Sequence, residues 1–133
     1  MPVRKGQKLA HPERDEQEKG TALMRAIGFS CLRFSQPVRT LQTPGIPDCF
    51  YFGKDLEHLD DGDTRDRSWG IWWEWKKPGA NRTPVQERVG LALSAGGQDY
   101  GWGCFDELVD YLAQHGFVQL TTGGAVQIIR RVR

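Results

Sequence analysis

The 133-residue chain carries 18 Lys and Arg against 17 Asp and Glu, for a formal net charge of +1, and 38% of its residues are hydrophobic. This size and composition indicate one folded domain over residues 1–133. They exclude a uniformly basic nucleic-acid coat, so any nucleic-acid site must be a local patch. No apolar run reaches the roughly 20 residues of a membrane span. The three cysteines are far apart, which indicates reduced thiols in a cytoplasmic protein.

The first part of the chain predicts one helix and two strands. Residues 1–12 are polar, and we expect them to be flexible. Residues 13–27 carry apolar side chains at helical spacing and stop before a glycine, which is typical of a helix. Residues 29–33 and 48–52 are short and rich in apolar and aromatic side chains, as strands are, and a proline-containing loop at 36–47 separates them.

The middle of the chain alternates between polar and aromatic segments. Residues 53–68 contain six acidic and three basic side chains, and we expect a long loop or a mobile hairpin tip there. Residues 70–77 predict a strand dense in tryptophan. A helix then begins with Thr83 as its N-cap and Pro84 at its first position, and it ends at the glycine pair 96–97.

The last part predicts a strand, a helix and a hairpin. The strand covers residues 99–104, and the amphipathic helix covers 105–115. Residues 117–120 and 125–132 flank a short turn and form the hairpin. The order of elements indicates an α/β domain with a small mixed β-sheet flanked by helices and a C-terminal hairpin.

Two segments carry residues that could take part in a chemical reaction. Glu74 and Lys76 lie two positions apart on one predicted strand, so they share a face at a separation of roughly 7 Å. If Asp48 begins an adjacent strand, its carboxylate joins Glu74. Two close carboxylates repel each other unless a proton or a cation separates them, and a hard divalent cation serves this purpose. This set suits metal-assisted hydrolysis of a phosphodiester; the alternative is an exposed, ion-paired sheet face.

Three segments in this order resemble the VRR-NUC family of the PD-(D/E)xK nuclease superfamily. They are Gly45-Ile46-Pro47-Asp48, Glu74-Trp75-Lys76 and Arg82-Thr83-Pro84-Val85-Gln86. The resemblance spans residues 13–112 and implies a fold like that of restriction endonucleases. It also implies a DNA endonuclease that depends on Mg²⁺ or Mn²⁺ and acts on branched, flap or junction DNA in repair or recombination. Small stand-alone members are viral or bacterial, so the expected location is the cytoplasm of a bacterium or of a phage-infected cell.

The resemblance also assigns roles within the site. Asp48, Glu74 and the backbone carbonyl of Trp75 would bind the metal ion, and Lys76 would position the attacking water. Gln86 would lie near that lysine.

Two of these assignments leave alternatives open. Thr83 and Gln86 also match a capping box, so a structural role for Gln86 stands beside the catalytic one. An acid of the first helix commonly completes the site in such nucleases, and helical phase favours Glu16, with Glu13 as the alternative.

A local basic patch accompanies the site. Residues 69–95 hold four basic and two acidic side chains, a net charge of +2, which suits contact with phosphates. The candidate nucleic-acid-binding residues are Lys77, Arg82, Arg88, Arg33 and Arg39. We expect DNA as the partner and a homodimer, with the aromatic surface around residues 69–75 as a candidate interface, and no membrane association. The rival hypotheses are a catalytically silent nucleic-acid-binding module and a protein-interaction domain on the same fold.

Overall fold

The computed structural model describes residues 12–34, 44–58, 61–62 and 64–132. Its elements are α2 (Pro12–Ile27), β1 (Ser30–Arg33), β2 (Cys49–His58), β3 (Thr64–Trp75), α3 (Pro84–Ala95), β4 (Asp99–Gly103), α4 (Phe105–Gln114), β5 (Val118–Leu120) and β6 (Val126–Ile128). This is the predicted order of helices and strands, with boundaries shifted by a few residues. The expectation of a flexible N-terminus concerns residues that, apart from Pro12, lie outside the described part of the chain.

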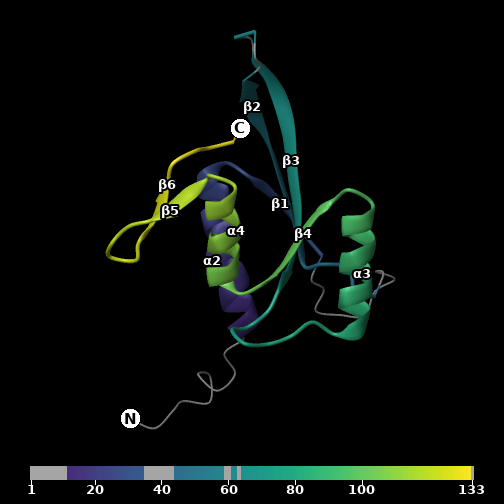
Figure 1. Ribbon diagram of the computed structural model, residues 1–133. Helices are drawn as coiled ribbons and strands as arrows, with labels where there is room; N and C mark the ends of the chain where they lie inside the picture. Colours follow the sequence, from purple (N-terminus) through teal and green to yellow (C-terminus); the bar gives the residue numbers. More distant parts are fainter. Residues whose placement is uncertain (1–11, 35–43, 59–60, 63, 133) are drawn as a thin grey trace.

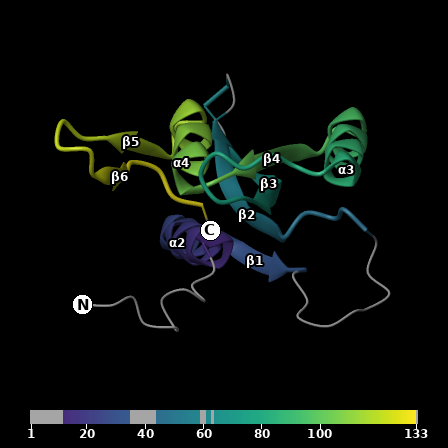
Figure 2. The same ribbon diagram turned by 90° about the horizontal axis from the view of Figure 1, so that it is seen from below.

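The main sheet has the strand order β1-β2-β3-β4. The pairs β1–β2 and β2–β3 are antiparallel, whereas β3 and β4 are parallel. Parallel neighbours need a crossover connection, and α3 provides it. Figures 1 and 2 show α2 and α4 on one side of this mixed sheet and α3 on the other, with the β5–β6 hairpin beside α4. The predicted fold class is therefore confirmed. Among the helices that the structure describes, none is long and apolar enough to cross a bilayer.

One face of the sheet forms the core. Side chains alternate between the two faces of a strand, and those that point toward α2 and α4 are at most 2% exposed: Cys49, Tyr51, Ile71, Trp73 and Trp75. Gly20 of α2 packs on the indole of Trp75, where a β-carbon would collide with the ring. Trp75 Nε1 donates to the Tyr51 hydroxyl at 3.1 Å, and that hydroxyl lies 2.7 Å from Thr21 Oγ1, whereas Trp69 Nε1 and the Tyr111 hydroxyl have no hydrogen-bond partner among the described residues.

The described residues of the polar segment 53–68 form the outer part of the β2–β3 hairpin, so the long-loop alternative was wrong and the hairpin alternative is confirmed, whereas its mobility stays a prediction. The ladder between β2 and β3 continues from Gly53 opposite Trp69 to His58 opposite Thr64. Here the hairpin extends beyond β1 and β4, and Lys54, Arg65 and Arg67 are exposed, so charged residues are compatible with strand pairing. An ion pair between Asp55 and Arg130 ties the hairpin to the C-terminal segment.

Candidate active site

The strand register brings the two predicted carboxylates together. Cys49 pairs with Trp73 in the antiparallel ladder, so the next position along it sets Asp48 opposite Glu74. Residues in such positions have β-carbons about 4.5–5.5 Å apart. The segment before Asp48 reaches this place because Gly45 adopts a φ of +80°, a conformation that favours glycine, and packs against Val85 of α3.

Hydrogen bonds hold both carboxylates in place. Asp48 Oδ2 accepts the backbone N–H of Trp75 at 2.8 Å. Glu74 is only 3% exposed, and its Oε2 accepts a hydrogen bond from Gln86 Nε2 at 3.1 Å. Lys76, one residue beyond β3, is also buried, and its backbone N–H donates to Gly103 O at 3.0 Å. The predicted trio of Asp48, Glu74 and Lys76 therefore meets at the C-terminal end of β3.

The electrostatics of the site centre on Glu74. Burial, followed by the charge of Asp48 and a hydrogen bond with it, raises the pKa of Glu74 to about 9. The charge of Lys76 opposes this rise, and that of Glu13 adds to it. The raised pKa means that Glu74 favours the protonated form in this position, where a cation would relieve the same repulsion.

This arrangement fits a hard divalent cation with few protein ligands. Mg²⁺ is usually held by one or two carboxylates together with water and substrate phosphate, and the Asp48–Glu74 pair meets that requirement. Across the described ranges, no three His, Cys, Asp or Glu side chains gather closely enough to hold a metal ion. The site therefore fits an ion that leaves coordination positions for water and phosphate. The carbonyl of Trp75 remains a predicted ligand.

Gln86 combines the two roles that the sequence left open. Its Oε1 accepts the backbone N–H of Thr83 at 2.8 Å, and its own N–H donates to Thr83 Oγ1 at 3.2 Å, which completes the capping box of α3. Its Nε2 simultaneously donates to Glu74. One side chain thus links the start of α3 to the carboxylate pair.

The N-terminal helix does not place Glu16 as expected. Glu16 Oε1 accepts the backbone N–H of Phe105 at 2.9 Å, at the start of α4, and Oε2 lies 2.8 Å from Lys19 Nζ. Burial alone would raise the pKa of Glu16, but these two hydrogen bonds lower it below its usual value. Glu13, one turn earlier, is the helix acid whose charge acts on Glu74. Helical phase favoured Glu16, but the packing of α2 on α4 engages its carboxylate at the start of α4, and a role for Glu13 at the site stays a prediction.

Arg82 is the best-positioned of the predicted nucleic-acid-binding residues. Its guanidinium lies 4.7 Å from the ring centroid of Trp102 and 5.8 Å from that of Tyr100. One of its nitrogens lies 3.8 Å from Glu87 Oε1, and its Nε is buried with no hydrogen-bond partner in the described part of the chain. The two aromatic rings and Glu87 therefore hold Arg82 in place at the edge of the site, where its guanidinium can donate a hydrogen bond.

The other basic candidates are placed differently. Lys77 and Arg88 are exposed, on the loop after β3 and on α3. Arg33 pairs with Cys49 in the β1–β2 ladder, which places it on the core-side face rather than the face of Asp48, contrary to our expectation. Arg39 lies outside the described residues.

Sequence reasoning missed two aromatic neighbours of the site, Tyr100 and Trp102. Trp72 pairs with Tyr100 and Glu74 with Trp102, so both aromatic residues share the face of the carboxylates. Burial raises the pKa of Tyr100, and the charges of Glu74 and Asp48 add to the rise. The alternation of β4 was visible in the sequence, but its parallel register with β3 was not.

Comparison with known proteins identifies the fold. No family model matches the chain, and no curated protein does. A solved structure described as a VRR_NUC domain matches with a TM-score of 0.54 at 22% sequence identity, and the match covers 81% of this chain and 100% of that one. The chain has the VRR_NUC fold. The resemblance seen in the sequence is thus confirmed for the fold, and the site described above lies within that VRR_NUC architecture.

Proposed function

We propose that this protein is a metal-dependent nuclease that hydrolyses phosphodiester bonds of DNA with Mg²⁺ or Mn²⁺. The observation that carries the proposal is the position of Asp48 opposite Glu74, with Lys76 at the end of the same strand. A buried acid next to a partly buried one, beside a buried lysine, is costly to maintain for stability alone. The same groups suit cleavage of a phosphate ester.

Each residue has a role that follows from its position. Asp48 and Glu74 would hold the ion, which when bound lowers the pKa of a water ligand and polarises the phosphate. Lys76 would hold the attacking water or a phosphate oxygen, since its ammonium group acts on Glu74 from within the buried site. Gln86 orients Glu74 by its hydrogen bond. Arg82, with its unpartnered Nε, would donate to a non-bridging oxygen of the phosphate.

Cleavage assays on branched and linear DNA test this proposal. We expect Asp48→Ala to abolish Mg²⁺-dependent cleavage and Lys76→Ala to reduce it by at least about a hundredfold, because each removes charge stabilisation from the transition state. Arg25→Ala, on the exposed side of α2, is the control with unchanged activity. Equal cleavage by wild type, Asp48→Ala and Lys76→Ala would refute the assignment. DNA binding that ignores both Mg²⁺ and Glu74→Ala would favour the silent binding module.

We further infer selectivity for branched DNA and a homodimer. Symmetric cleavage of a junction requires two sites, and two-fold pairing of identical chains provides them. The aromatic positions considered for the interface are largely used within the chain. Trp73 and Trp75 are buried, Trp69 packs edge-on against Phe117, and Trp72 stacks on Phe50. Sedimentation velocity with and without a four-way junction measures the assembly, and a monomer in both conditions would refute the dimer.

A further inference from the structure

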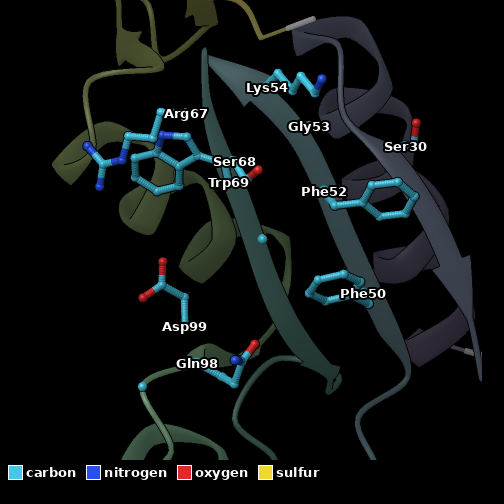
Figure 3. Close-up of a pocket in the computed structure, with 12 residues that line it drawn as sticks. Ser30, Phe50, Phe52, Gly53, Lys54, Arg67, Ser68, Trp69, Gln98 and Asp99 are labelled. Atoms are coloured by element: carbon cyan, nitrogen blue, oxygen red, sulfur yellow. The ribbon is translucent and has the colours of Figure 1, made fainter. Parts of the chain in front are cut away.

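A cavity of about 770 Å³ opens on the sheet face that carries the two carboxylates. Phe50 and Phe52 of β2 line it, together with the start of β4, as Figure 3 shows. Pockets for small organic groups commonly measure about 300–1,000 Å³, so the cavity has room for a nucleobase with its sugar.

The aromatic side of the cavity is flat and partly open to solvent. The rings of Phe50 and Phe52 are nearly parallel, with centroids 5.6 Å apart and an interplanar angle of 18°. Phe52 is 36% exposed. Gly70, opposite Phe52 in the ladder, leaves room for the Phe50 ring, which a β-carbon at that position would meet. The glycine therefore keeps this aromatic surface clear.

Charged and polar side chains stand around the aromatic surface. Lys54 lines one end of the cavity, and Gln98 and Asp99 line the opposite end (Figure 3). Arg67 also borders the cavity, but it pairs with Asp55 in the ladder, and its guanidinium lies 5.0 Å from the ring centroid of Trp69, on the other face of the sheet. Lysine suits phosphate. Amide and carboxylate groups pair with the donors and acceptors on a base edge. A surface of flat apolar rings with a cation at one end matches the chemistry of a nucleotide better than that of an apolar protein segment.

The phenylalanines of the cavity lie on the same face of the sheet as the carboxylate pair. Asp48, Phe50 and Phe52 occupy alternate positions leading into and along β2 and therefore face the same way. Four residues of strand place Phe52 about 13 Å from Asp48, a span of a few nucleotides of one DNA strand. A base held by Phe52 can thus belong to the strand whose phosphate lies at Asp48 and Glu74.

We propose that this cavity is a nucleobase subsite, in which an unpaired base of the DNA strand stacks on Phe50 and Phe52 while Lys54 holds a flanking phosphate. This inference deepens the proposed nuclease function and rests on it for the identity of the strand. The base must be unpaired because a base inside a duplex is already stacked and does not present its flat face to a protein. The subsite therefore favours substrates with a single-stranded segment next to the cut.

Binding without divalent cation tests the subsite independently of cleavage. The probe is a short single-stranded DNA that contains 2-aminopurine. Binding at low salt is measured by fluorescence anisotropy and by the quenching of the 2-aminopurine fluorescence. We expect Phe52→Ala to weaken binding about tenfold and to abolish the quenching, as the loss of one base–aromatic stack predicts. Phe52→Tyr restores both signals. Leu91→Ala, which truncates a 70% exposed residue of α3 outside the cavity, leaves them unchanged.

A second measurement uses the wild-type protein alone, so that folding of a variant is not at issue. Abasic sites are placed one at a time along the unpaired arm of a flap substrate. We expect one position, a few nucleotides from the junction, at which loss of the base weakens binding about tenfold while neighbouring positions have little effect. Lys54→Ala lowers the salt dependence of binding, whereas Arg25→Ala does not.

The outcomes separate this inference from the proposed function. If an abasic site has the same effect on binding at every position and the 2-aminopurine fluorescence is not quenched, the nucleobase subsite is refuted even if Mg²⁺-dependent cleavage is observed. A single sensitive position with quenching would support it even if no cleavage occurs. If Phe52→Ala instead converts a dimer into a monomer and leaves DNA binding unchanged, the cavity belongs to a protein interface, and the nucleobase proposal is wrong.

Discussion

The two faces of one sheet differ sharply in how they are covered. The face toward α2 and α4 is closed, and its side chains on β2 and β3, such as Tyr51 and Trp73, are at most 2% exposed. The opposite face is covered only in part by α3 (Figure 1), so that Glu74 is buried while Phe52, on the neighbouring strand, is 36% exposed. The same alternating strands thus provide a core on one side and an acidic site beside an open aromatic surface on the other.

The two faces also differ in how their polar groups are paired. On the closed face, Tyr51 is satisfied by Thr21 and Trp75. On the open face, Glu74 meets a second acid, and the Nε of Arg82 lacks a partner among the described residues. Repelling buried groups cost stability, and the Asp48–Glu74 pair lies on the face to which we assign the chemistry. On the closed side, Trp69 Nε1 and the Tyr111 hydroxyl also lack a hydrogen-bond partner among the described residues. The residues that form the core and the residues to which we assign the chemistry therefore lie on opposite faces of the sheet.

The largest expected difference is in the stability of tryptophan variants. Trp73→Ala on the closed face should cost about 3–5 kcal/mol of the free energy of unfolding, because it leaves a cavity in the core. Trp72→Ala on the open face should cost less, since its partly exposed ring stacks on Phe34 and Phe50 at 5.5 and 4.6 Å. Urea unfolding measures both. Equal losses would show that the open face contributes as much to stability as the core.

The next expected effect is stabilisation by a divalent cation. Mg²⁺ at roughly a hundred times its dissociation constant should stabilise the wild-type protein by about 2.7 kcal/mol, because the ion relieves the repulsion between Asp48 and Glu74. Asp48→Asn should abolish the shift in melting temperature, whereas Asp110→Asn, an exposed acid of α4, should retain it. A shift that survives Asp48→Asn would place the ion elsewhere.

Gln86 provides a sharper comparison, because it serves both stability and the site. Gln86→Ala and Thr83→Ala should each cost about 1 kcal/mol, since each removes half of the capping box of α3. Only Gln86→Ala also removes the hydrogen bond to Glu74, so only this variant should lower cleavage beyond its effect on folding. Thermal unfolding and single-turnover cleavage distinguish the two. Equal cleavage by both variants would leave Gln86 with a purely structural role.

The smallest effect concerns a thiol at the edge of the closed face. A hydrogen bond from Cys49, helped by Arg33 and Arg25, lowers the pKa of Cys31, whereas burial raises that of Cys104. The thiolate is the reactive form, so alkylation of Cys31 should reach its plateau at a lower pH than that of an ordinary cysteine. Mass spectrometry after brief treatment with iodoacetamide at neutral pH should find Cys31 modified before Cys104. The reverse order would contradict this interpretation.

The sequence by itself determined the order of elements, the capped start of α3 at Thr83 and the burial of alternate tryptophans. These features depend on residues close together in the chain, whose spacing and capping chemistry are local. The sequence did not decide between a loop and a hairpin for the polar segment 53–68, because its strands are stabilised by pairing with each other rather than by hydrophobic residues. The order of Asp48, Glu74 and Lys76 along the chain matches a known motif, and this match indicated the site before any geometry was available.

Only the tertiary structure decided which groups meet. The register that sets Asp48 opposite Glu74, the parallel pairing that brings in Tyr100 and the hydrogen bond of Glu16 at the start of α4 all depend on contacts between distant segments. Such contacts are fixed by how whole helices and strands pack, for example by Gly20 of α2 against Trp75. A local pattern specifies which face a side chain takes, whereas packing across the sheet specifies its neighbours.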